Sequence, residues 1–306
     1  MPEKGLTKGL YPGAFTGIDG GCLNGNHKGL FGCAIPIYQP ETIAWIKQLA
    51  SPLPSAFFIF EMDTLIRNLK AASIWKQLDR LWIFATEQQA HARVSIVNPN
   101  GINTSWPSSI TEQSSPSWTK LKGYKGNAAS SYLLTNYNPA SNANNFTLNS
   151  SSIGFYSIGT ESNQYAVPMG GYTQIASINY IIRVSTPVWS PGFGKYYYTW
   201  GLNEANTGTL ILGAAQTPVT GMFSAVRSLP SGSAMFQNGN VIATESDASN
   251  AIPSFNIPII ASNFNGTMSD YSSNTFSMAF IGSGNINQAL LYNYIHQFMG
   301  KIGINV

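Results

Sequence analysis

The stretch that decides the fold is YIIRVSTPVWSPGFGKYYYTW, residues 180–200. Its two ends, Tyr180–Val184 and Lys195–Trp200, are short runs of β-branched and aromatic residues, which favour strands. Between them, Ser190–Gly192 contains proline and glycine, which are typical of turns. The segment therefore predicts two strands with a turn-rich connection rather than a helix.

The same sequence pattern extends from about residue 86 to residue 282, where short apolar runs alternate with clusters of turn-forming residues. Around ten such runs at this spacing are typical of a β-sandwich or barrel. Asn238–Asn240 has the turn chemistry of a tight hairpin, because asparagine and glycine accept positive φ. The further predicted strands are Val94–Val97, Ser131–Leu134, Gly154–Ile158, Thr209–Leu212, Gly221–Val226, Ala234–Phe236, Ile257–Ala261 and Phe276–Ile281.

Helical patterns flank this β region on both sides. Pro40 and Glu41 suit the first turn of a short helix, since proline and acidic residues are favoured there. Asp63 is a candidate N-cap for a second helix, whose apolar residues recur at three- and four-residue spacing. The chain ends in a third helix, which Asn285 or Asn287 caps.

These sequence patterns predict three regions along the chain. Residues 1–40 are a Gly-rich, extended N-terminal arm, and residues 41–85 are a helical segment that leads into the first strand. Residues 86–306 form the β-sandwich domain with its C-terminal helix at 286–300. Residues 140–152, ASNANNFTLNSSS, are expected to be a solvated loop.

Composition excludes several classes of function. Only 9% of the 306 residues are charged and 43% are hydrophobic, so the chain is not a disordered polyelectrolyte. The net charge is +3 without a Lys/Arg run, which argues against nucleic-acid binding. The longest apolar stretch, Ala56–Phe60, is far shorter than the roughly 18 residues of a membrane span. No signal peptide is visible at the N-terminus.

Cys22 and Cys33 are the only cysteines. They could form a disulfide, but two thiols without a secretion signal are more simply reduced. A zinc site with Cys22, His27 and Cys33 would lack a fourth ligand from this segment. We therefore predict no metal site and no cofactor.

Two segments carry a resemblance to a known family. LIRNLKAASIWKQLDRLWIFA, residues 65–85, and FSMAFIGSGNINQALLYNYIHQFMGKIG, residues 276–303, resemble phage and prophage virion structural proteins of Bacteroidetes-type hosts. Trp118–Leu133 continues the first match. The resemblance implies a mainly β fold, an antiparallel jelly-roll (concanavalin-A-like) sandwich, located on the virion as a tail, fibre or capsid-surface component.

Within the first matched segment, apolar residues are expected to be packing positions. Leu69, Trp75, Leu78 and Trp82 would be core or helix-packing positions. Asp79 lies three residues after Lys76, which predicts a solvent-exposed ion pair that contributes little to stability.

Carboxylates offer no catalytic pair that we would assign. Glycoside hydrolases on sandwich folds use two carboxylates at close spacing. Glu61 and Asp63 occupy alternate positions at a helix start and do not face one cleft. Glu245 and Asp247 lie in ATESDASN, which is expected to be a loop. A calcium site at Asp247 and Asn250 lacks the alternating Asp/Asn pattern of calcium loops.

Histidine chemistry is equally unsupported. His27, His91 and His296 are scattered, and the chain has neither a Gly-x-Ser-x-Gly elbow nor a phosphate-binding glycine loop. His296 is expected to be an exposed or half-buried helical residue. We predict no catalytic residues, and the chain is not expected to be an enzyme.

One segment contains the residue types that bind carbohydrates. In such sites, aromatic rings pack against the C–H surfaces of the sugar. Aromatic side chains concentrate in residues 188–200, on a Pro/Gly turn and on one face of the following strand. The same rings could instead fill the core or a subunit interface, which is also rich in aromatics. The candidate glycan-binding residues are Trp189, Phe193, Tyr196, Tyr198 and Trp200, with Tyr197 on the opposite strand face.

Three functions remain. The first is a non-enzymatic virion structural protein that assembles as a homo-oligomer, a trimer being one possibility, with the 1–40 arm docked on another virion protein. The second is a receptor-binding module that attaches to host surface glycan through 188–200 or 140–152. The third is a glycan depolymerase with Glu245 as its candidate carboxylate.

Overall fold

The computed structural model describes residues 37–98, 109–159, 161, 165–175, 178–186, 188–190, 195–211 and 220–306. Within these ranges, the side chains of residues 175, 178–180, 188–190, 210 and 211 are not described. The chain divides into two compact units, Met1–Tyr38 and Gln39–Val306. The second unit contains every described helix and strand.

The predicted arm lies almost entirely outside the described residues. Cys22, His27 and Cys33 fall there as well, so the disulfide and the rejected zinc site stay predictions. The helical segment 41–85 belongs to the same compact unit as the sandwich.

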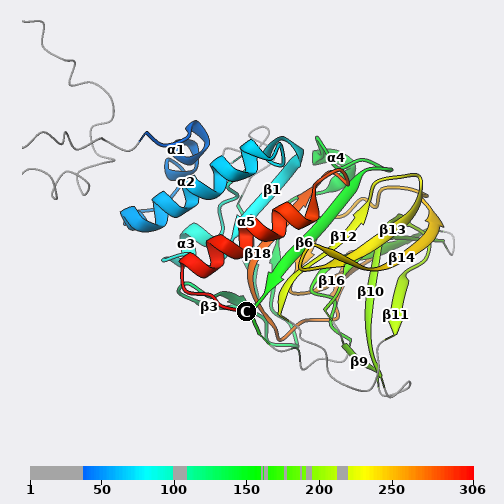
Figure 1. The fold of residues 1–306 in the computed structure, drawn as a ribbon. Coiled ribbons are helices and arrows are strands. Elements are labelled where there is room, and N and C mark those ends of the chain that lie inside the picture. Colours follow the sequence, from blue (N-terminus) through cyan, green and yellow to red (C-terminus); the bar gives the residue numbers. More distant parts are fainter. Residues whose placement is uncertain are drawn as a thin grey trace, which may run out of the picture. The chain divides into compact units, whose positions relative to one another are not determined.

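Two sheets form a sandwich (Figure 1). The eight-stranded sheet has the order β14-β13-β12-β6-β18-β4-β3, with β1 also paired to β18. Its strands are β1 (Leu78–Ile83), β3 (Ser117–Thr119), β4 (Gly123–Lys125), β6 (Ser151–Ser157), β12 (Gly221–Arg227), β13 (Ser231–Gln237), β14 (Asn240–Ala248) and β18 (Thr275–Gly282).

The ten-stranded sheet has the order β11-β10-β8-β7-β15-β5-β2, with β9 paired to β10 and the β16–β17 hairpin attached to β7. The pairings are mainly antiparallel, but β16 runs parallel to β7. Its strands are β2 (Thr111–Gln113), β5 (Tyr132–Leu134), β7 (Met169–Ile175), β8 (Ile178–Val184), β9 (Val188–Ser190), β10 (Lys195–Glu204), β11 (Gly208–Ile211), β15 (Pro258–Ile259), β16 (Ser262–Phe264) and β17 (Thr267–Ser269).

The main core lies between the inner faces of the two sheets. Alternate residues of a strand point to opposite faces, so Phe155 and Phe223 of one sheet meet Ile182 and Tyr198 of the other. The Tyr198 and Phe223 rings are 6.0 Å apart. These packed layers confirm the predicted mainly β, antiparallel sandwich.

Helices cover the outer face of the eight-stranded sheet (Figure 1). Tyr156, which points away from the core residue Phe155, places its hydroxyl 2.8 Å from His296 Nδ1 on α5. Phe58 of α2 packs edge-on against Phe298 of α5 at 5.8 Å. The helices are α1 (Pro40–Ile46), α2 (Ala56–Ala71), α3 (Gln89–Ala92), α4 (Pro139–Asn142) and α5 (Gln288–Lys301), with a 3₁₀ turn η2 (Trp75–Gln77).

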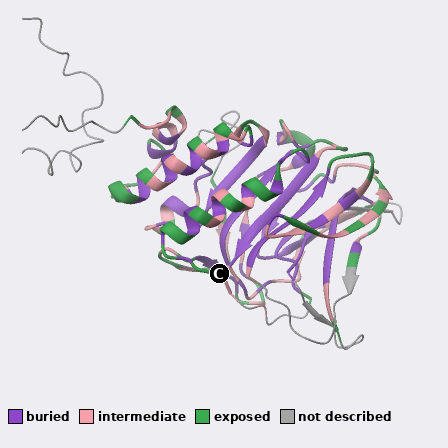
Figure 2. Cartoon of the chain, viewed as in Figure 1, coloured by how far each residue is buried: buried purple, intermediate pink, exposed green. Residues whose placement is uncertain are grey.

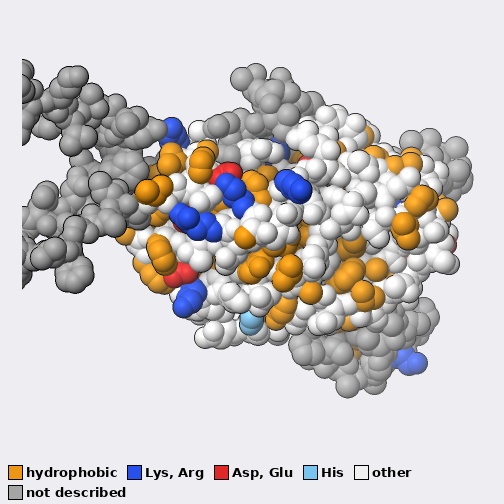
Figure 3. Space-filling model, turned by 45° about the horizontal axis from the view of Figure 1, so that its top comes forward, with side chains coloured by type: hydrophobic (Ala, Val, Ile, Leu, Met, Phe, Trp, Pro, Cys, Tyr) orange, Lys and Arg blue, Asp and Glu red, His pale blue; other side chains and the backbone are white. Residues whose placement is uncertain are grey.

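This double cover explains the burial pattern of β6. All seven residues of β6 are buried, because one face meets the core and the other meets α5. Figure 2 shows mostly buried strands beside helices that carry both buried and exposed faces. The face drawn in Figure 3 shows scattered charged side chains on a largely uncharged polar surface, as the composition predicts.

Local turn and cap signals were predicted correctly. Asn238 and Gly239 both adopt positive φ, 51° and 78°, in the two-residue turn between β13 and β14. Asn287 is the N-cap of α5, where its side chain accepts a hydrogen bond from Leu290 N at 3.0 Å.

Other boundaries were wrong. Helix α2 begins at Ala56, after the Ser55 cap, and not near Asp63. Asp63 lies inside α2, buried, and accepts hydrogen bonds from Gln39 N and Thr42 Oγ1 at 2.6 Å each, so it fastens α1 to α2. The predicted strand at Val94–Val97 is only an isolated bridge from Val94 to Ser109.

Asp79 is not part of an exposed ion pair. It is completely buried and accepts a hydrogen bond from Tyr137 Oη at 2.7 Å. The backbone N–H groups of Asn144, Asn145 and Phe146 also donate to its carboxylate. The 140–152 segment is therefore anchored on the sandwich, with Phe146 in the core, and is not a freely solvated loop.

Candidate functional site

A cavity of about 470 Å³ lies on the ten-stranded sheet. On β8, Ile182 and Val184 face the core, so their neighbours Ile181 and Arg183 point to the outer face of the sheet. Small-molecule sites are typically cavities of about 300–1,000 Å³ with apolar walls and a few polar groups. The described residues that line the cavity are Tyr172, Gln174, Ile181, Arg183, Thr207 and Phe264.

A pair of aromatic rings forms one wall of the cavity. Tyr172 on β7 and Phe264 on β16 are direct neighbours in the parallel strand pair, and their ring centroids are 4.4 Å apart. Both side chains remain partly exposed. Asn265 fixes the β16–β17 hairpin to β7, because its side chain accepts a hydrogen bond from Gln174 N at 2.6 Å. The rings are thus held on rigid strands.

Arg183 supplies the charge of the cavity. Its Nε atom is buried and has no hydrogen-bond partner in the described part of the protein. Burial lowers the pKa of Arg183, while Asp270, Tyr197 and Tyr172 act in the opposite direction. An arginine keeps its proton under ordinary conditions. The cavity therefore contains a desolvated positive charge.

The sequence analysis selected the face of β10 that points to the core, whereas the cavity lies on the outer face of the sheet. Tyr198 and Trp200 are each only 2% exposed and belong to the core, so they present no ring face to a sugar. Tyr196 is partly exposed. Tyr197, assigned to the other face, is the electrostatic neighbour of Arg183.

The remaining two predicted residues cannot be placed. The side chain of Trp189 and the whole of Phe193 lie outside the described residues. Glycan contact by them therefore stays a prediction.

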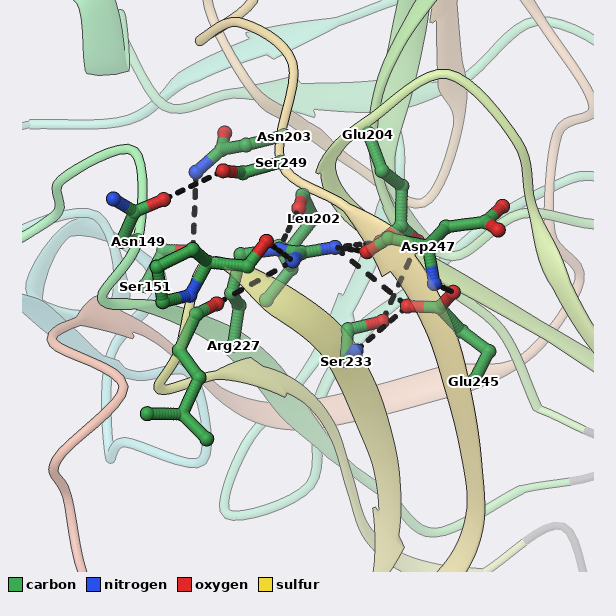
Figure 4. A network of polar contacts seen from close by, with 12 residues as sticks. Asn149, Ser151, Leu202, Asn203, Glu204, Arg227, Ser233, Glu245, Asp247 and Ser249 are labelled. Atoms are coloured by element: carbon green, nitrogen blue, oxygen red, sulfur yellow. Dashed lines mark hydrogen bonds and ion pairs between the residues drawn. The ribbon is translucent and has the colours of Figure 1, made fainter.

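The predicted candidate carboxylate Glu245 belongs to a different site (Figure 4). It lies on strand β14, not in a loop, and accepts hydrogen bonds from Ser233 N at 2.6 Å and Asp247 N at 2.5 Å. The Glu204 carboxyl at the end of β10 contacts the Arg227 guanidinium of β12, and both side chains are buried. Arg227 also lies 3.6 Å from Glu245. The cluster ties the two sheets together at one end of the sandwich.

Glu204 and Glu245 have the electrostatics of an acid–base pair but not the access. Burial and the neighbouring Glu245 carboxyl raise the pKa of Glu204 to about 9, although Arg227 acts against them. Such perturbed pairs are common in active sites. However, the side chains of Glu204 and Arg227 are both 0% exposed, so a polysaccharide cannot reach them.

The predicted histidine and metal positions have structural surroundings. His91 Nε2 lies 2.8 Å from the Ala50 carbonyl oxygen, and His296 is half-buried between Tyr156 and Tyr292. Among the described residues, no three His, Cys, Asp or Glu side chains gather as metal ligands would. None of the described helices is both long and apolar enough to cross a membrane.

Comparison with known proteins yields distant structural neighbours. The binding domain of botulinum neurotoxin serotype D aligns with a TM-score of 0.45 at 10% identity, over 74% of this chain and 53% of that chain. The CBM40 module of the Ruminococcus gnavus IT-sialidase aligns with a TM-score of 0.31 at 13% identity, over 45% of this chain and 78% of the module. The leech intramolecular trans-sialidase aligns with a TM-score of 0.32 at 11% identity, over 52% of this chain and 24% of that chain.

Some of these neighbours bind sugars. The R. gnavus module has been solved bound to α2,3-sialyllactose, and cell entry of neurotoxin type C depends on interaction with two ganglioside molecules. This chain spans about half the length of the neurotoxin chains it matches. The scores are too low to transfer those ligands to this chain.

No protein-family model and no curated protein matches the sequence. The phage resemblance, the virion location and the homo-oligomer therefore stay predictions, and the site has to be judged by its own geometry.

Proposed function

We propose that this protein is a non-catalytic carbohydrate-binding module, with its ligand site in the cavity over β7, β8 and β16. The observation that carries the proposal is the Tyr172–Phe264 ring pair, held at 4.4 Å on adjacent strands and partly exposed in a cavity that also contains Gln174, Thr207 and Arg183. Aromatic faces receive the C–H surfaces of sugar rings, and amide, hydroxyl and guanidinium groups bind sugar hydroxyls.

Two features support binding without hydrolysis. Glycoside hydrolysis requires a pair of carboxylates beside the scissile bond. The described lining of the cavity contains neither Asp nor Glu, and the Glu204–Glu245 pair lies in a buried cluster. A bound saccharide would therefore be held and released unchanged.

A binding role also fits the predicted setting on a phage particle. A module of this kind would attach the virion to glycan on the host surface, as the second of the three sequence-based hypotheses states. The support for the virion itself is the sequence resemblance of residues 65–85 and 276–303.

The test is a glycan array of bacterial and animal surface saccharides, followed by titration calorimetry on the best ligand. We expect Phe264→Ala to reduce the affinity by about tenfold or more, in line with removal of a central aromatic contact. Tyr292→Ala is the matched control, because this half-buried ring stacks on His296 at 5.2 Å on helix α5, away from the cavity.

Both variants should retain the wild-type circular dichroism spectrum. The proposal fails if the wild-type protein binds no saccharide, or if Phe264→Ala and Tyr292→Ala affect binding equally.

A further inference from the structure

Arg183 is a partly buried charge that its surroundings leave uncompensated. Its Nε has no hydrogen-bond partner in the described chain, and none of the salt bridges between described residues includes it. Asp270 is its acidic neighbour and acts on it electrostatically, but none of the salt bridges between described residues joins the two. Desolvation of an unpaired charge is unfavourable, so a pairing partner from outside would stabilise this group.

The two fully buried arginines, Arg80 and Arg227, are compensated within the fold. Arg227 is held by Glu204, by Glu245 and by the carbonyl oxygens of Leu202 and Asp247. Arg80 has unpartnered nitrogens too, but it lies over the Tyr137 ring at 5.6 Å, donates to the Asp79 carbonyl oxygen at 2.9 Å and lines neither described cavity. Among these three arginines, Arg183 is therefore the one that can meet a ligand.

Both neighbouring strands place a glycine opposite Arg183. Its two cross-strand partners are Gly170 on β7 and Gly201 on β10, so neither partner contributes a side chain of its own. A Cβ at Gly170 would lie 2.0 Å from the Ile182 carbonyl oxygen, and the φ of Gly170 is +111°. Glycine is thus required at position 170, whereas at Gly201 the side chains of Ile181 and Glu204 already lie where a Cβ would be.

The charge and the aromatic wall meet in one cavity. Tyr172 is both a member of the ring pair and an electrostatic neighbour of Arg183. A sugar ring placed on Tyr172 and Phe264 would therefore have its substituents close to the guanidinium. Arginine binds carboxylates through two parallel N–H···O bonds, which adds both affinity and orientation.

We propose that the ligand of this cavity is an acidic saccharide whose carboxylate pairs with Arg183. This inference rests on the proposed carbohydrate-binding function and names the class of sugar. A hexuronate or a nonulosonate supplies the same carboxylate, whereas a sulfated neutral sugar presents a tetrahedral anion instead.

The experiment uses the full chain and matched pairs of oligosaccharides. Each uronate- or nonulosonate-containing ligand is compared by titration calorimetry with its carboxyl-reduced alcohol, and an O-sulfated neutral saccharide is the third arm. We expect the wild-type protein to bind the acid at least about tenfold more tightly than the alcohol. Arg183→Gln should remove this preference, because it should lower the affinity for the acid far more than the affinity for the alcohol.

Two further variants keep the inference testable if Arg183→Gln folds poorly. Arg183→Lys retains the charge but loses the planar fork, so it should keep only part of the preference. Asp270→Asn removes the neighbouring negative charge and should increase affinity for the acid several-fold without affecting the alcohol. Asparagine tolerates the left-handed φ of 49° at position 270.

The outcomes separate the two proposals. Equal binding of acid and alcohol by the wild-type protein overturns the carboxylate inference and leaves the carbohydrate-binding function intact. Preference for the sulfated sugar over the carboxylate also overturns it. Absence of binding to every arm overturns the proposed function itself.

Discussion

Arg183 and Arg227 come from strands that face each other across one sandwich, but their environments differ in kind. Arg227 is 0% exposed and is saturated by carboxylate and carbonyl oxygens from strands β10 and β14 and from the turn after β12. Arg183 lines a cavity, and its Nε has no partner in the described chain. The comparison teaches that a charge satisfied by the fold stabilises the fold, whereas a charge left unsatisfied at a cavity is available to a ligand.

The largest expected effect is on the saturated arginine. Arg227→Ala leaves the buried Glu204 and Glu245 carboxyls and the Leu202 carbonyl oxygen without their donor, so it should lower the free energy of unfolding by about 3–5 kcal/mol. Urea denaturation followed by circular dichroism measures this change. The control is Arg93→Ala, whose partly exposed pair with Glu112 spans 3.7 Å and should contribute less than about 1 kcal/mol.

The same cluster predicts an alkaline loss of stability. The pKa of Glu204 is raised from 4.5 to about 9 by burial and by Glu245, so the folded state retains a proton that the unfolded state releases. Stability should therefore be fully present below about pH 4.5 and fall as the pH rises toward 9, by at most about 1.4 kcal/mol per pH unit.

Glu204→Gln should flatten this dependence, since the amide keeps the shape and does not titrate. Denaturation curves at several pH values between 5 and 9 compare the two proteins. A slope that is identical in both would show that Glu204 does not hold the proton.

The smallest effect is expected at the unsatisfied arginine. Arg183→Gln removes a charge that makes no ion pair in the described chain, so the free energy of unfolding should change by less than about 1 kcal/mol. A loss as large as that of Arg227→Ala would make Arg183 a structural residue and would abolish the comparison.

The parts of the fold that were predicted from the sequence are governed by local chemistry. Asn238–Gly239 and the Asn287 cap need only their own backbone conformation, which few residue types can adopt. The start of α2 was missed because Ala56–Phe60 is apolar throughout and shows no helical periodicity, although Ser55 caps the helix there by accepting a hydrogen bond from Phe58 N. Asp79 was misjudged because its partners come from residues 137–146, far along the chain.

The candidate site could not be predicted for the same reason. Phe264 reaches Tyr172 through the parallel pairing of β16 with β7, and Arg183 lies on β8, the other neighbour of β7. The spacing of these residues in the sequence gives no signal of the parallel pairing. In the aromatic stretch, the period of the strand was correct, but which face is turned inward depends on the opposing sheet. Tyr198 and Trp200 pack in the core with Phe223, whereas Tyr197 lies on the outer face and is an electrostatic neighbour of Arg183.

The bare backbone beside Arg183 has a consequence for how relatives of this protein can be recognised. Because the carbonyl of Ile182 excludes any side chain at position 170, a diverged homologue can exchange the aromatic wall, and with it the sugar, far more easily than this glycine. A glycine opposite an outward arginine on antiparallel strands is therefore the sequence signature by which the binding surface could be traced after overall similarity has faded.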